Sequence, residues 1–321
     1  MSIPLNRSLR LEDLRALPKF RDSLGYLYVE HARVERHEHS IAIYDDEGCT
    51  PAPASSLAVL MLGPGTRVTQ SAMMTLADNN CLVIWCGEEN VRFYAYGTGG
   101  TRSSAPLLHQ ARLVADERLR LDVVKRMYRM RFDDEIDPTF TIEQLRGMEG
   151  VRVRETYARM ARETGLEWSG RSYDRGSWKS ADPVNRALSC ANSCLYGLCH
   201  AAILSTGYSP GLGFIHTGKQ LSFVYDIADL YKVDITIPIA FRAAIDKPSN
   251  LERSVRLSCR DAFRDHKLLA RVIPDIQKAL GTPKELLDEM FTPDSDPALP
   301  TDLWTPEPEP QPRSGDEQWG D

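Results

Sequence analysis

The sequence lacks several features that would place it in familiar classes. Residues 1–20 contain no apolar stretch typical of a secretion signal. No apolar run approaches the ~20 residues that a membrane-spanning helix needs. The seven cysteines are odd in number and form no small-domain framework, which argues against a disulfide-stapled fold and favours free thiols in a reducing cytoplasm. The phosphate-binding loop pattern of nucleotide-hydrolysing enzymes is also missing.

The net charge of −6 is unevenly distributed along the chain. Residues 292–321 hold eight acidic residues and one arginine, which leaves +1 for residues 1–291. Residues 112–131 carry seven Lys/Arg against three Asp/Glu, and residues 253–271 carry six against two. Such basic stripes are what a phosphate backbone requires. Solvated helix faces explain the counts equally well.

The order of the apolar patterns predicts an α+β protein, with a small N-terminal β-rich domain followed by a larger all-α catalytic domain. Residues 71–79 predict a small helix, and helical spacing of apolar residues runs from 107 to 131. Short segments rich in Val, Ile, Tyr and Leu predict strands at 27–34, 40–44, 57–62, 81–85 and 91–96.

Composition also predicts the domain boundaries. We expect the β-rich domain at residues 1–97, a flexible Gly/Thr/Ser-rich linker at 98–105 and the helical domain at 106–291. Residues 292–321 hold seven of the 20 prolines and many acidic residues, so we expect this tail to be disordered.

Glu149 is the first candidate functional residue. A capping box at 141–144 predicts a helix that runs to about residue 164 and ends at Gly165. Glu149 shares one face of this helix with the apolar Leu145, Val153 and Tyr157. A carboxylate on such a face needs a partner. The flanking Gly147 and Gly150 favour close approach of a metal or a substrate backbone, and a salt bridge to Arg152 is the alternative.

The segments GFIHTGK at 213–219 and YDIAD at 225–229 contain the other candidates. His216 lies in a glycine-rich loop, and Asp226 and Asp229 are neighbours on a helix predicted at 221–231. Two carboxylates that close require a cation or a proton. Oxygen ligands with a single nitrogen are typical of hard divalent metals, which often support phosphoryl transfer. A structural loop histidine and a solvated acidic helix face are the alternatives.

A cluster on another predicted helix resembles a zinc site only superficially. Its members are Cys190, Cys194, Cys199 and His200. Their spacing fits no metal-site pattern, and the surrounding small residues predict a helix packed closely in the core.

These motifs together resemble the integrase subunit of the CRISPR adaptation machinery, in particular the type I-E branch of this CRISPR-associated (Cas) integrase/endonuclease. The resemblance extends from about residue 57 to 273 and includes several motifs in the same order. Besides the segments around Glu149, His216 and Asp229, they are PGTR at 64–67, VR at 91–92, SCLYG at 193–197 and RLSCRD at 256–261.

The resemblance implies a homodimer, two of which flank a dimer of a small ferredoxin-like partner protein. The complex would capture a prespacer duplex DNA and join its 3' ends to the CRISPR repeat by transesterification, without a nucleotide cofactor. Glu149, His216 and Asp229 would bind Mg²⁺ or Mn²⁺, and Asp226 would hold the site together or accept a proton. The resemblance thus makes all four residues catalytic.

It further implies that the DNA is gripped by basic side chains and splayed by an aromatic wedge. Candidate phosphate contacts are Arg67, Arg92, Arg154, Lys219 and Arg256. Candidate stacking residues are Tyr26, Tyr28 and His31, since a ring offsets lost base stacking. Phosphate contacts carry little sequence information, so we expect many prespacer sequences to be accepted.

Two other functions use the same residues. A metal-dependent nuclease acting on branched DNA in repair would use water in place of the 3'-hydroxyl. An architectural DNA-binding scaffold would need no metal chemistry, and the intact quartet of Glu149, His216, Asp226 and Asp229 argues against it.

We expect deletion of residues 292–321 to leave folding intact, because this segment has no apolar periodicity that could pack. The melting temperature and the cooperativity of unfolding, followed by circular dichroism, should match those of the full chain. Loss of the cooperative transition would contradict the prediction. Partner binding is a separate readout, because Leu303 and Trp304 form a short apolar patch that could dock on another subunit.

Overall fold

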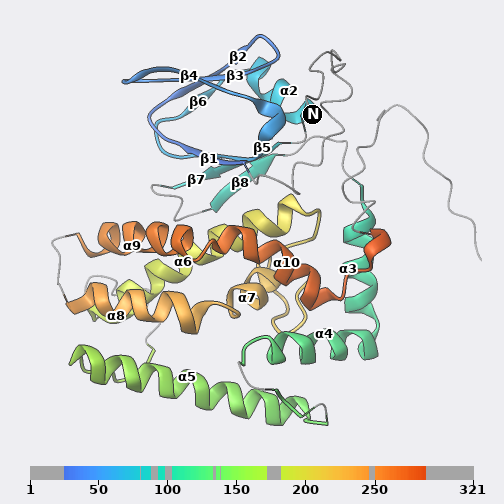
Figure 1. Cartoon of the computed structure of the whole chain (residues 1–321), viewed down its shortest axis with the longest axis vertical. Helices are drawn as coiled ribbons and strands as arrows, with labels where there is room; N and C mark the ends of the chain where they lie inside the picture. Colours follow the sequence, from blue (N-terminus) through green and yellow to red (C-terminus); the bar gives the residue numbers. More distant parts are fainter. Residues whose placement is uncertain are drawn as a thin grey trace, which may run out of the picture.

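The computed structural model describes residues 25–79, 81–87, 93–97, 103–132, 135–137, 139–171, 182–245 and 250–286. The described strands precede the long helices in the chain, which confirms the predicted α+β class. Figure 1 shows the strands gathered at one end of the molecule, with α6 running beneath them and α5 on the far side of the helical region.

The strands form two four-stranded sheets. In the first sheet, the order is β1 (Gly25–Val29), β5 (Leu57–Leu62), β7 (Leu82–Cys86) and β8 (Phe93–Gly97), and only β8 runs antiparallel to its neighbour. In the second sheet, the order is β4 (Gly48–Ala52), β3 (Ser40–Asp45), β2 (Arg33–His37) and β6 (Arg67–Val68).

The core of this β region lies between the sheets and α2 (Gln70–Asp78). Val34 and Ile41 of the second sheet, Leu60 of the first and Leu76 of α2 are all fully buried there. The predicted segment 27–34 is in fact two strands separated by a turn, where His31 has a positive φ of 51°. Two short edge strands, β4 and β6, were not predicted.

The helical region begins with α3 (Ala105–Ala115) and α4 (Glu117–Arg129). The sequence predicted one helical segment over 107–131, and the structure corrects this. Asp116 has extended backbone angles, and its carboxylate accepts a hydrogen bond from the backbone N–H of Leu119 at 2.9 Å. It therefore acts as the N-cap of a new helix. Beyond these two, the helices are α5 (Ile142–Thr164), α6 (Pro183–Ser205), α7 (Ser222–Ala228), α8 (Ile237–Ile245), α9 (Leu251–Asp265) and α10 (Leu268–Leu280).

Helix α5 follows its local signals closely. The Thr141 hydroxyl accepts from the Gln144 backbone, and the Gln144 side chain accepts from the Thr141 backbone, so the predicted capping box is confirmed. Gly165 ends the helix in the left-handed conformation, with φ of 66°. These caps fix the register of α5 and hence the direction of Glu149.

Helix α6 is the central core helix. By length and composition alone, it is long and apolar enough to cross a membrane, although no spanning helix is expected from the sequence. However, 67% of its most apolar stretch is buried inside the protein, as in a core helix of a folded domain. Cys190, Cys194 and Cys199 are buried among apolar residues, and His200 stacks on Phe93 at 3.7 Å, which confirms the packing interpretation of this cluster.

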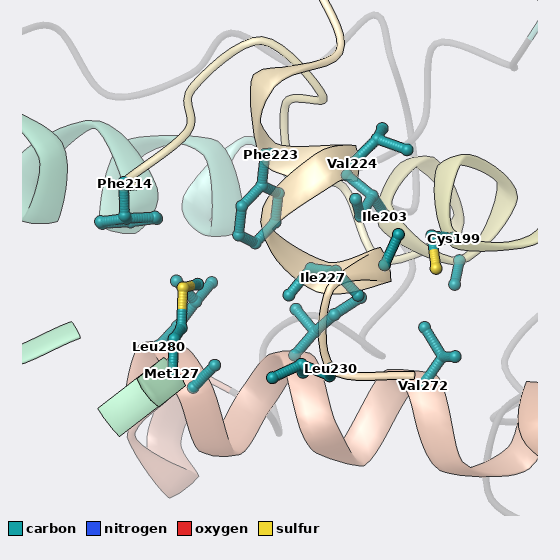
Figure 2. Packing of buried hydrophobic residues seen from close by; sticks show 14 of the residues in the cluster. Met127, Cys199, Ile203, Phe214, Phe223, Val224, Ile227, Leu230, Val272 and Leu280 are labelled. Carbon is teal, nitrogen blue, oxygen red and sulfur yellow. The ribbon is translucent and has the colours of Figure 1, made fainter. Parts of the chain in front are cut away.

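Helix α7 is enclosed by α4, α6 and α10. Its Phe223, Val224 and Ile227 project into the cluster that also contains Ile203 and Val272 (Figure 2). The helix is shorter than the predicted 221–231 and is followed by the π-helical segment η4 (Lys232–Thr236). Such segments are rare and often accompany functional sites. The apolar packing fixes the direction in which the polar face of α7 points.

Several sequence predictions lie outside the described residues. They concern most of the linker, the acidic tail at 292–321, and Arg92. Strand β8 ends at Gly97 and α3 begins at Ala105, so the proposed boundary falls between these two elements.

Candidate active site

Asp226 is a fully buried carboxylate that organises the loop before α7. Its two oxygens accept hydrogen bonds from the backbone N–H groups of Phe214, Ile215 and His216, at 2.6, 3.1 and 2.8 Å. The imidazole Nδ1 of His216 lies 2.7 Å from Oδ1. These donors offset the desolvation of the charge. Asp226 therefore fixes both the loop backbone and the histidine ring.

His216 is held by this contact with one nitrogen directed outward. Because an ionised carboxylate only accepts, Nδ1 donates to Asp226, and Nε2 is the ring nitrogen left to face the site. Nε2 lies 3.9 Å from Asp229 Oδ2. Gly213 makes the tight loop possible, since a Cβ there would come within 2.3 Å of the His216 carbonyl oxygen.

Glu149 lies at the edge of the apolar face of α5 and is partly buried. Its Oε1 lies 3.5 Å from Arg131 NH1, and its Oε2 lies 3.4 Å from Arg152 NH1. The Arg152 salt bridge considered from the sequence is thus present, together with one that was not foreseen. A Cβ at Gly147 would meet no atom within 4 Å among the described residues, whereas a Cβ at Gly150 would lie 3.5 Å from Arg154 NH1.

Asp229, at the C-terminal end of α7, completes the cluster. Its Oδ1 lies 2.6 Å from Lys232 Nζ, and its Oδ2 lies 3.7 Å from Arg131 NH2. Burial lowers the pKa of Lys232, but the Asp229 carboxylate and the Tyr196 hydroxyl outweigh it and raise the pKa above its usual value. Lys232 is therefore a permanent cation at this site.

The structure brings Glu149, His216 and Asp229 to one place, with Asp226 behind them. Two carboxylates and one imidazole suit a hard divalent ion, and a carboxylate behind the histidine is a common support for a metal ligand. As they stand, however, no three acidic, histidine or cysteine side chains among the described residues converge closely enough to hold a metal. Arg131 lies between Glu149 and Asp229.

The proposed DNA contacts occupy different positions. Arg67 of β6, Arg154 of α5 and Lys219 of the loop before α7 are exposed. Lys219 also anchors the start of α7, because Ser222 Oγ bonds both its N–H and its carbonyl. Arg256 of α9 is half-buried and faces the thiols of Cys190 and Cys194.

The aromatic candidates also differ. Tyr28 is part-buried, stands against Gly63 and donates its hydroxyl to Glu30 at 2.6 Å. His31 is exposed at the β1–β2 turn, beside Gly65. The side chain of Tyr26 lies outside the described residues.

Three cations of the site were not singled out from the sequence. Arg131 was counted only as part of the basic stripe at 112–131, and Arg152 only as an alternative partner. Lys232 stands three residues after Asp229, a spacing that brings the two onto one helix face and could have indicated their ion pair.

The comparisons with known proteins agree with one another. The family model described as "CRISPR associated protein Cas1" matches residues 131–253. A curated protein from Thermus thermophilus, "CRISPR-associated endonuclease Cas1 2", is 56% identical over 295 residues, which cover 91% of this chain and 90% of that protein. "CRISPR-associated endonuclease Cas1" of Escherichia coli is 45% identical over 262 residues, covering 81% and 86%.

A solved structure is also similar. The one described as "Crystal structure of TtCas1-DNA complex" superposes with a TM-score of 0.75 at 58% identity, and covers 83% of this chain and 100% of that chain.

The hydrogen-bond set of Asp226 predicts a large stability cost for Asp226→Asn. The amide nitrogen can only donate, so at least one of the converging donors loses its acceptor in a buried place. We expect the free energy of unfolding to fall by about 1–3 kcal/mol. Urea denaturation of the variant and the parent protein measures this change.

Asp234→Asn is the matched control. Its side chain is 68% exposed and contacts Arg152 at 3.6 Å, so a change within about 0.5 kcal/mol is expected. Equal losses for the two variants would contradict the organising role of Asp226.

Proposed function

Because the chain belongs to the Cas1 family of CRISPR-associated proteins, we propose that it is the metal-dependent DNA integrase of CRISPR adaptation. It joins the 3'-hydroxyl ends of a captured prespacer to the CRISPR repeat by transesterification. The observation that carries this proposal is the placement of Glu149 and Asp229 on the two sides of Arg131, with His216 Nε2 3.9 Å from Asp229 Oδ2 and Asp226 orienting the histidine.

The chemistry requires an exchange of phosphodiester bonds. The prespacer 3'-oxygen forms a bond to the phosphorus at the 5' end of a repeat strand, and the bond from this phosphorus to the 3'-oxygen of the preceding nucleotide breaks. A proton passes from the attacking hydroxyl to the departing oxygen. One phosphodiester replaces another, so no nucleotide is consumed. A Mg²⁺ or Mn²⁺ ion held by Glu149, His216 and Asp229 would neutralise phosphate charge and lower the pKa of the hydroxyl.

His216, Asp226 and Lys232 have different roles in the proposed reaction. His216 presents Nε2 because Asp226 keeps the proton on Nδ1. Asp226 is fully buried, and both of its carboxylate oxygens already accept hydrogen bonds. This favours a positioning role over that of a proton acceptor. Lys232 keeps its charge beside Asp229 and contributes positive potential where a phosphate would approach.

Exposed cations provide the means of binding DNA without reading its sequence. Arg154 and Lys219 lie on elements that carry the site, and Arg67 lies on the β region; Arg92 and Arg256 complete the proposed set. Contacts to phosphates give affinity with little base specificity. The similar structure described as a DNA complex supports DNA as the partner of this chain.

The assembly is also part of the proposal. We propose a homodimer, with two dimers flanking a dimer of the small ferredoxin-like adaptation partner. The relatives are named endonucleases, which favours strand cleavage with water as a second activity of the same residues. A repair nuclease would use that activity alone.

The test of the proposal is strand transfer. We expect the purified protein, with the ferredoxin-like partner, to join a prespacer duplex to a supercoiled plasmid bearing the repeat array, only when Mg²⁺ or Mn²⁺ is present. His216→Ala should reduce joining by at least about 100-fold, because it removes a ligand from a site that acts as a unit. Prespacers with blocked 3' ends should not join.

His39→Ala is the matched control, since this histidine is exposed at the β2–β3 turn. It should leave joining unchanged. Nicking of the plasmid without joining would favour the nuclease function. Prespacer binding with no reaction, or metal-dependent joining that persists in Glu149→Ala, His216→Ala and Asp229→Ala, would favour the scaffold.

A further inference from the structure

Arg131 is an unusual residue in this molecule. It follows the end of α4, and its side chain is 4% exposed. Among the described residues, Arg131 and Asp226 are the buried residues with a charged side chain. A buried charge requires compensation. Asp226 has a full set of hydrogen-bond donors. The compensation of Arg131 is of a different kind.

The guanidinium of Arg131 is bracketed by carboxylates without being tightly bonded to them. NH1 lies 3.5 Å from Glu149 Oε1 and NH2 lies 3.7 Å from Asp229 Oδ2, whereas charge-assisted pairs are usually about 2.7–2.9 Å apart. Neither Nε nor NH2 has a hydrogen-bond partner within the part of the chain that the structure describes. The ring of Tyr128 lies under the group, with Cζ 4.9 Å from its centroid. Arg131 is thus held by charge and by stacking more than by directed bonds.

The other cations of the site bind the outer oxygens of the same two carboxylates. Arg152 contacts Glu149 Oε2, and Lys232 contacts Asp229 Oδ1. The inner oxygens, Glu149 Oε1 and Asp229 Oδ2, face Arg131, and Asp229 Oδ2 is also the atom nearest to His216 Nε2. Arg131 therefore lies between Glu149 and Asp229, next to the Asp229 oxygen that His216 also approaches.

We propose that Arg131 is a resident cation that fills the metal position of the free protein and is displaced from the inner oxygens when a divalent ion binds. This inference rests on the proposed metal dependence. Without Arg131, only Arg152 and Lys232 would offset the repulsion between Glu149 and Asp229. With Arg131 present, the two carboxylates keep their positions, but an entering ion must compete with the guanidinium for their oxygens. Arg131 thus weakens metal binding by the free protein and preserves the positions of the ligands.

The displaced guanidinium can bind a phosphate. Its Nε and NH2 donors form no hydrogen bond with any described residue, and a guanidinium suits phosphate oxygens. The DNA phosphate that accompanies the ion can accept from them, so metal and DNA should each favour the binding of the other.

The experiment measures Mn²⁺ binding to the free, full-length protein by electron paramagnetic resonance, with melting temperatures in EDTA and in Mn²⁺. Arg131→Met removes the charge and retains a long apolar side chain. We expect roughly tenfold or more tighter Mn²⁺ binding, because a like charge next to the ion is removed. We also expect a lower melting temperature in EDTA and a larger rise on adding Mn²⁺ than in the parent protein.

Arg152→Met is the matched comparison, since it removes the same charge from an outer oxygen of Glu149. Its effect on Mn²⁺ affinity should be clearly smaller. If the methionine variant fails to fold in EDTA, Arg131→Lys replaces it in the experiment. The Mn²⁺ affinity of Arg131→Lys should also exceed that of the parent protein, because an ammonium cannot bridge both carboxylates in the same way.

The outcomes separate the two proposals. If the parent protein binds Mn²⁺ and His216→Ala abolishes this, but Arg131→Met leaves the affinity unchanged or weaker, the displacement of Arg131 is wrong while the metal site stands. Equal tightening by Arg131→Met and Arg152→Met would likewise overturn displacement, leaving only a general charge effect. If no variant binds Mn²⁺, with or without prespacer DNA, the proposed metal dependence fails together with this inference.

Discussion

The contact on which the site depends is the one between Asp226 and the loop that precedes α7. Three consecutive backbone N–H groups and the imidazole of His216 converge on one carboxylate. The aspartate is immobilised in turn because other residues of α7, namely Phe223, Val224 and Ile227, are packed into the apolar core. A buried charge and an apolar core thus determine together where His216 points, and neither would do so alone.

The second constraint is the balance of charge around Glu149 and Asp229. Each has a cation at its outer oxygen, and they share Arg131 between their inner oxygens. Partly buried carboxylates are costly to leave unpaired, and the proposed metal would have to enter between them. The arginine contacts of 3.4–3.7 Å are longer than ordinary charge-assisted hydrogen bonds, whereas Lys232 is held tightly to Asp229 at 2.6 Å.

The sequence predicted those parts of the molecule that have local signals. Helix α5 was predicted with nearly its observed bounds because a capping box and a glycine mark its ends. The His216–Asp226 pair lies within eleven residues of chain. Strand β4 was missed because it is an exposed edge strand containing Pro51, with no alternation of apolar residues. Arg131 was missed as a site residue because its place depends on how the end of α4 meets α5 and α7.

This contrast has a physical basis in the task of the site. A side chain that keeps one orientation is best fixed by short bonds within a few residues, as His216 is by Asp226. The proposed displacement of Arg131 requires the opposite arrangement, in which long contacts come from separate elements and each can be given up without unfolding a helix. The acidic residues therefore appear as motifs in the sequence, whereas the charges that balance them become evident only in the folded chain. The proposed site for a metal and a polyanion would need both kinds of residue, because carboxylates alone would repel a phosphate.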